Sequence, residues 1–108
     1  MAGGRAEEFD CELNTECANM VRNKVIPAIN IEAERSAEKF AGNICESEWN
    51  LDLINRTSFW PASGKYRFVM NIENDCGQYM ACYLIFSERR GSRRHFNSIE
   101  TLKCKEYR

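Results

Sequence analysis

The side chains with the clearest chemical potential in this sequence are six cysteines: Cys11, Cys17, Cys45, Cys76, Cys82 and Cys104. An even number of cysteines in a chain of 108 residues is typical of a disulfide-bonded protein from an oxidising compartment. The less favoured interpretation is a cytosolic protein whose thiols are free and buried. No two cysteines have the Cys-x2-Cys spacing of a zinc site, and His95 is the only histidine. We therefore expect disulfides and a secreted protein, with no bound metal.

A second group of residues, Arg89, Arg90, Arg93 and Arg94, forms a basic cluster in a polar segment that leads to His95. Guanidinium groups at this density favour an acidic or polyanionic partner, such as a glycosaminoglycan. The alternative is a solvated hairpin tip without a partner. His95 has no Ser, Cys or Asp partner nearby in the sequence, so we interpret it as a surface residue. The sequence also lacks a glycine-rich phosphate loop and a nucleophile elbow, and it predicts neither an enzyme nor a bound cofactor.

The segment Phe59-Trp60-Pro61 offers a different kind of chemistry, namely apolar contact with a protein partner. A large aromatic side chain on a stiff proline turn loses little entropy when it docks. The alternative is that Phe59 and Trp60 cover the open end of a sheet. Just upstream, Asn55-Arg56-Thr57 matches the acceptor sequence for N-glycosylation, so Asn55 is a predicted modification site.

The strand that must position these residues is the stretch 65–73, where apolar and polar side chains alternate. Tyr66, Phe68, Met70 and Ile72 fall on one side, which predicts a strand with one buried face. Further strands are expected at residues 49–53, 80–87 and 96–104. Turns are expected at residues 58–64 and 74–77, and the basic cluster forms the last loop.

A helix upstream of these strands is the element able to cover the buried face. Apolar residues recur at three- and four-residue spacing through Cys17, Met20, Val21 and Val25, and then through Ile29, Ala33, Ala37, Phe40 and Ala41. Asn14 or Thr15 can cap the start, and Gly42-Asn43 ends the pattern. Pro27 interrupts it, so either a second helix begins there or one longer helix is kinked there.

Together these elements predict an α+β fold, with one N-terminal helical region packed on a four-stranded antiparallel meander. We expect residues 1–10 to be a flexible tail and residues 11–108 to be one domain. The net charge of −1 gives no global attraction to nucleic acid or to an anionic membrane. No apolar run approaches the ~20 residues of a membrane span. The first residues lack the apolar centre of a signal peptide.

Several short segments resemble the cystatin superfamily, and its latexin branch in particular. The similar segments are Pro27-Ala28, Ala33-Glu-Arg-Ser-Ala37, Ala41-Gly-Asn43 and Ser63-Gly-Lys-Tyr-Arg-Phe68, together with the order of Cys76, Cys82 and Cys104. The resemblance covers about residues 26–104. It implies one long helix wrapped by a curved antiparallel sheet.

The resemblance also implies a function. Cystatins that inhibit papain-like cysteine proteases insert a wedge made of a tail glycine, a Gln-Val-Val-Ala-Gly hairpin loop and a second hairpin loop with Pro-Trp. The corresponding positions here are Gly3 or Gly4, the segment Phe59, Trp60, Pro61 to Gly64, and the arginines of residues 89–94. The first loop lacks Gln-Val-Val and the second lacks Pro-Trp. Latexins instead block metallocarboxypeptidases with paired cystatin-like domains.

Two functions therefore stand as expectations. The first is a secreted inhibitor that binds a protease through these three segments. The second is a non-inhibitory binding module that recognises a protein or a polyanion through the basic cluster.

One disulfide follows from the resemblance and from the strand order. Cys82 and Cys104 fall on adjacent predicted strands and match the last bridge of secreted cystatins. Closing that loop would stabilise the fold by about 3 kcal/mol. The pairing of the other four cysteines is open, although we favour Cys45 or Cys76 bonding to Cys11 or Cys17.

Overall fold

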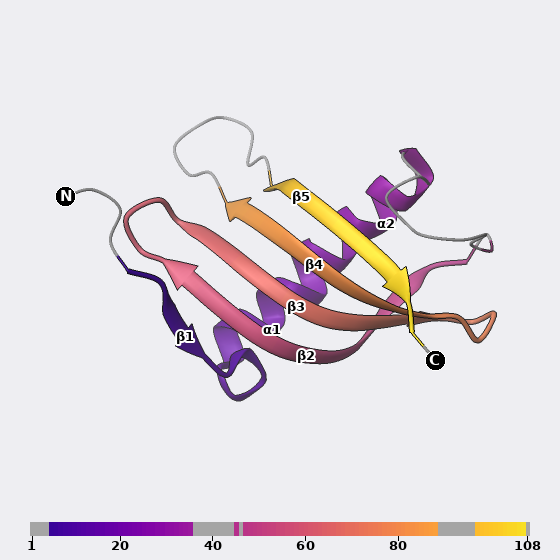
Figure 1. Ribbon diagram of the computed structural model, residues 1–108, viewed down its shortest axis with the longest axis horizontal. Helices are drawn as coiled ribbons and strands as arrows, with labels where there is room; N and C mark the ends of the chain where they lie inside the picture. The colour runs from indigo at the N-terminus through magenta and orange to yellow at the C-terminus, as the bar shows by residue number, and fades with distance from the viewer. Residues whose placement is uncertain (1–4, 36–44, 46, 89–96, 108) are drawn as a thin grey trace.

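In the computed structural model, one helical region lies across one face of a curved antiparallel sheet (Figure 1). The structure describes residues 5–35, 45, 47–88 and 97–107. The strands are β1 (Glu7–Phe9), β2 (Trp49–Trp60), β3 (Lys65–Asn74), β4 (Tyr79–Glu88) and β5 (Asn97–Glu106). Their order in the sheet is their order in the chain. The fold is α+β, as the alternating patterns predicted.

The sheet has five strands, so the prediction of four was wrong. The additional strand is β1, which lies among the residues assigned to the tail. It pairs antiparallel with β2, with Glu7 opposite Phe59 and Phe9 opposite Thr57. Three residues are too few to produce a recognisable alternation, so the sequence carried no strand signal there. A disulfide joins Cys11, two residues after this strand, to Cys17.

The helical region is continuous through Pro27. It comprises a 3-10 turn η1 (Cys11–Leu13), α1 (Thr15–Met20), a π-helical segment η2 (Val21–Val25) and α2 (Ile26–Arg35). Asn14 is the cap of α1, and its side chain accepts a hydrogen bond from the Cys17 amide at 3.0 Å. The wider π turn immediately before Pro27 accommodates the residue that has no amide hydrogen and whose ring crowds the preceding turn. The predicted continuation through Ala37, Phe40 and Ala41 lies outside the described residues.

The buried side of the sheet faces this helix, as the alternation in residues 65–73 predicted. Phe68, Met70 and Ile72 from β3 are fully buried. Leu84 and Phe86 from β4 and Val21, Val25 and Ile29 from the helical region complete the centre of the core. Burial of each of these side chains contributes about 1.5–3 kcal/mol, so the helix and the sheet stabilise each other. Ala33 packs at the margin of the same cluster.

Strand β2 is longer and less regular than predicted. It extends to Trp60, so the expected turn at residues 58–64 shortens to residues 61–64. Register shifts occur between Leu51 and Leu53 and again between Ile54 and Arg56. These bulges break the simple alternation, because one added residue reverses the face to which the following side chains point. Leu53 is therefore 42% exposed while the next residue, Ile54, is buried.

All six cysteines form disulfides. Cys82 bonds to Cys104 across the β4–β5 pair, as the resemblance implied. The other bridges are Cys11–Cys17 and Cys45–Cys76, so the favoured link between these two pairs was wrong. The 3-10 turn η1 and the start of α1 bring Cys11 and Cys17 together locally, with their Cα atoms 5.3 Å apart. None of the helices in the described part of the chain is long and apolar enough to cross a membrane.

One side chain of α2 ties the helix to the free edge of β2. The Asn30 carboxamide accepts a hydrogen bond from the Trp49 amide at 2.7 Å and donates one to the Trp49 carbonyl at 3.0 Å. It thereby imitates a neighbouring strand at a position that β1 does not reach. Because the Trp49 amide and carbonyl both bond to Asn30, this part of the β2 edge is not available to pair with a strand of another chain.

We expect Asn30→Ala to lower the free energy of unfolding by about 2 kcal/mol, because it removes two hydrogen bonds to the Trp49 backbone. Chemical denaturation with tryptophan fluorescence measures this. The matched control is Asn23→Ala, which makes the same change at an exposed position of η2. An equal loss in the two variants would contradict the role assigned to Asn30.

Candidate functional site

Several segments suspected of partner binding come together at one end of the sheet. The start of β1 pairs with the end of β2, with Glu7 opposite Phe59. The β2–β3 turn lies beside them, and Lys65 at its exit is opposite Ser87 near the end of β4. Ser87 in turn is opposite Ser98, so β5 begins at the same end (Figure 1). We call this end of the molecule the loop end.

Some predicted site residues lie outside the described residues, namely Gly3, Gly4, Arg89, Arg90, Arg93, Arg94 and His95. The strands that flank them are described. The register places the end of β4 and the start of β5 at the loop end.

The β2–β3 turn is held in one backbone conformation. The Trp60 carbonyl accepts hydrogen bonds from the Ser63 amide at 3.2 Å and the Gly64 amide at 2.9 Å. Gly64 has a φ of 69°, a left-handed conformation that glycine adopts without steric penalty. Pro61 and the two residues after it are exposed. The turn thus projects a stiff apolar tip from the loop end.

Phe59 and Trp60 do not form a joint apolar surface, because consecutive strand residues point to opposite faces. The Phe59 ring lies 4.6 Å from the Tyr66 ring on the side that faces the helix. Trp60 lies on the other side, with the Arg67 guanidinium 5.5 Å from its ring centre. Both aromatics are half-buried. Covering the sheet end, the alternative role considered above, describes them better than an exposed wedge does.

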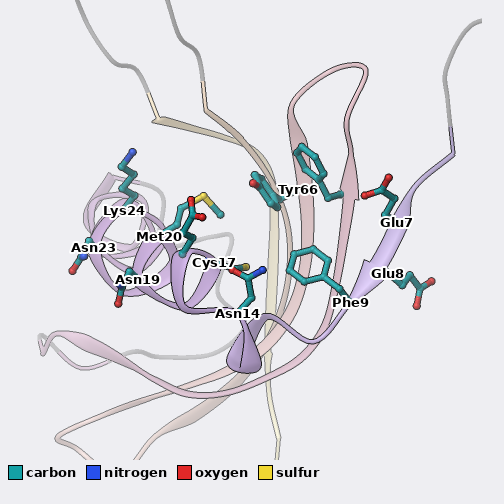
Figure 2. Close-up of a pocket in the computed structure, with 12 residues that line it drawn as sticks. Glu7, Glu8, Phe9, Asn14, Cys17, Asn19, Met20, Asn23, Lys24 and Tyr66 are labelled. Carbon is teal, nitrogen blue, oxygen red and sulfur yellow. Dashed lines mark hydrogen bonds between the residues drawn. The ribbon is translucent and has the colours of Figure 1, made fainter.

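A groove of about 770 Å³ opens between the aromatic side of the loop end and the helical region (Figure 2). Phe9, Phe59 and Tyr66 line it from the sheet. Met20 and Cys17 line it from the helical region, and Asn14, Asn19, Asn23 and Lys24 add polar groups there. Glu7, Glu8 and Glu16 stand around it. The groove combines an apolar lining with a polar rim.

Sequence reasoning did not identify this groove. Tyr66 and Met20 were assigned to the core, and Phe9 was placed in the tail. The available signal was that Phe9 is the only large apolar residue among the first ten. Nothing in the sequence showed that Phe9 and Met20 would lie on opposite sides of one opening, because β1 was not predicted.

Two exposed ion pairs lie near the loop end. Arg56 contacts Glu8 at 3.2 Å, and Lys65 contacts Glu100 at 2.9 Å. Each such exposed pair contributes between a few tenths of a kcal/mol and about 1 kcal/mol to the stability of the fold. They fix the orientation of side chains next to the turn more than they stabilise the fold.

In the described part of the chain, no three His, Cys, Asp or Glu side chains are placed to hold a metal ion. Among the described residues, Tyr107 has a shifted pKa, and it lies at the opposite end of the sheet. Its partial burial and the Asp52 carboxylate, which accepts its hydrogen bond at 3.3 Å, raise the pKa of Tyr107 above 10.0. This group lies far along the sheet from the groove.

Comparison of the chain with known protein families, with curated proteins and with solved structures finds no match. The function must therefore be argued from the loop end itself.

The stiffness of the β2–β3 turn can be tested at Gly64. We expect Gly64→Ala to lower the free energy of unfolding by about 1 kcal/mol, because an alanine is strained at this φ while no neighbouring atom obstructs its Cβ. Gly64→Asn should lose less, since asparagine tolerates the left-handed region. Equal losses in thermal unfolding of both variants would show that backbone strain is not the cause.

Proposed function

We propose that the protein is a secreted inhibitor that binds a protease through the loop end. The observation that carries this proposal is the shared position of β1, the β2–β3 turn and the strands that flank the basic cluster. A protease cleft is long and narrow, and a row of loops from one end of a sheet can enter it together. The three disulfides support an oxidising compartment.

The order of elements supports a cystatin-like form of this inhibitor. A short first strand, one long helical region and four further strands in meander order agree with a helix wrapped by a curved sheet, which the resemblance implies. The Cys82–Cys104 bridge agrees with the same resemblance. Both hairpin loops differ in sequence from those of cystatins. Since these loops would contact the protease, the differences affect which protease is bound.

The contact surface we propose has two parts. Pro61 and its exposed neighbours form the tip that enters the partner, and their fixed backbone keeps the entropy lost on docking small. The groove beside the tip, with Phe9 and Tyr66 in its lining, accepts an apolar side chain of the partner. A buried apolar anchor beside a rigid tip is the arrangement that concentrates binding energy in a few residues.

The direct test is inhibition of a papain-like cysteine protease and of a metallocarboxypeptidase by the oxidised protein. We expect inhibition at micromolar concentration or below in at least one class. Pro61→Asp should weaken it by about tenfold or more, because a carboxylate would be desolvated in the contact.

The matched control is Asp75→Ala, a substitution in the exposed turn at the opposite end of the sheet. This variant should inhibit like the wild type. Absence of inhibition in both protease classes would reject the proposal for them. Equal effects of the two substitutions would reject the loop end as the contact.

The second candidate function is recognition of a polyanion through the basic cluster. It is favoured by the register of β4 and β5, which brings the strand ends that flank this segment to the loop end. Binding to a sulfated glycosaminoglycan would then involve the same end of the molecule.

Retention on a heparin column measures this second candidate. We expect salt-sensitive retention that the double variant Arg93→Ala/Arg94→Ala loses, because two guanidinium contacts with sulfate are removed. The control Lys103→Ala/Lys105→Ala removes the same charge from exposed positions of β5. Retention that falls equally in both double variants would show attraction to overall charge instead of the basic cluster.

A further inference from the structure

Thr57 carries a hydroxyl group that the folded protein does not use. The residue is only 2% exposed, and its Oγ1 atom has no hydrogen-bond partner in the described part of the chain. Its neighbours across the sheet are Phe9 on β1 and Phe68 on β3. An unpaired buried hydroxyl destabilises a fold, and a valine would fill the same space without that penalty. Folding alone therefore gives no reason for a threonine here.

Asn55, two residues earlier, is exposed on the opposite face. It lies at the second bulge of β2, between the register positions of Ile54 and Arg56. Its Nδ2 atom donates a hydrogen bond to Asn71 Oδ1 at 3.2 Å. Asn71 alternates with the buried Met70 and Ile72, so its side chain is on the sheet face away from the helix. The Asn55 amide is thus available on that outer face.

We propose that Asn55 carries an N-linked oligosaccharide, that the sugar is attached before β2 folds, and that Thr57 retains its hydroxyl for that reaction. Asn55 and Thr57 are the first and third positions of the acceptor sequence, and the third position must carry a hydroxyl. In the folded chain Thr57 is only 2% exposed, so its hydroxyl is out of reach of an enzyme. The modification must therefore precede folding.

The donor is an oligosaccharide activated as a glycosyl diphosphate. The Asn55 Nδ2 atom attacks the anomeric carbon, where a carbon–nitrogen bond forms and the carbon–oxygen bond to the diphosphate breaks. The diphosphate leaves with the electron pair of the broken bond, and the proton that Nδ2 loses is released to water. Nδ2 keeps its second hydrogen, which can still be donated to Asn71 after folding.

The attached sugar would lie on the most apolar part of the outer face. Leu53 is 42% exposed and Tyr83 is 40% exposed. Leu53 is opposite Asn71, and Tyr83 is opposite Val69, two residues along β3 from Asn71. An oligosaccharide rooted at Asn55 would shield this surface and leave the loop end as the accessible binding surface.

The first experiment directs the full chain through the secretory pathway of a eukaryotic cell and treats the secreted protein with a peptide N-glycosidase. We expect the wild type and Thr57→Ser to lose mass, and Asn55→Gln and Thr57→Val to be unaffected. Secreted wild-type protein that carries no sugar would overturn the proposal, as would a sugar on Thr57→Val at Asn55.

The second experiment measures thermal unfolding of the unglycosylated, oxidised proteins. Thr57→Val should have a Tm at least equal to that of the wild type and up to about 4 °C higher, because an unpaired hydroxyl is replaced by a methyl group. A clearly lower Tm would show that the hydroxyl serves the folded state, and would overturn its assignment to glycosylation.

The third experiment tests the timing. Oxidised wild-type protein and reduced, alkylated wild-type chain are offered to microsomes that contain the transferase and its lipid-linked donor. We expect only the reduced, alkylated chain to be modified, and the same treatment of Thr57→Val to give no product. Equal modification of the folded and unfolded chains would overturn the claim that attachment precedes folding.

Discussion

The structure depends on burial of one face of the sheet by the helical region. Phe68, Met70 and Ile72 of β3 meet Val25 and Ile29 on a surface that excludes water. This contact fixes which face of every strand points inward, because a one-residue shift in register would expose the whole set. The loop end and its groove are consequences of where the helix begins and where β2 turns back.

The edge of β2 is covered or hydrogen-bonded along much of its length. β1 covers the last residues of β2, and Asn30 satisfies the backbone at its first residue. Between them, the Glu12 carboxylate accepts a hydrogen bond from the Ile54 amide at 3.4 Å. The two bulges add twist to the same strand. A strand treated in this way pairs poorly with a second chain, so contact through the loops is favoured over contact through the sheet edge.

The strongest patterns in the sequence predicted the fold class. The alternation through Tyr66 and Phe68 located β3 and its buried face, and the three- and four-residue spacing through Val21 and Val25 located the covering helix. Both signals are strong because burial of one face acts on many residues at once. β1 could not be predicted, since it has three residues and its pairing depends on a partner some fifty residues away.

The site was less predictable than the fold for the same reason. The turn after Trp60 was predicted, but the opposite orientations of Phe59 and Trp60 depend on the length of β2, and that strand was predicted to end too early. The groove requires β1 and α1 to stand on opposite sides of Tyr66. The pairing of the four remaining cysteines follows from the path of the chain and not from their spacing.

Amide hydrogen exchange of the oxidised protein, alone and with an excess of a protease that it inhibits, tests the central claim most directly. If the helix-covered sheet presents its loop end to the partner, exchange should slow in residues 5–9 and 60–66 and remain unchanged in the β3–β4 turn at residues 74–79. Slower exchange confined to that opposite turn, or to the outer-face residues of β4 and β5, would contradict the account.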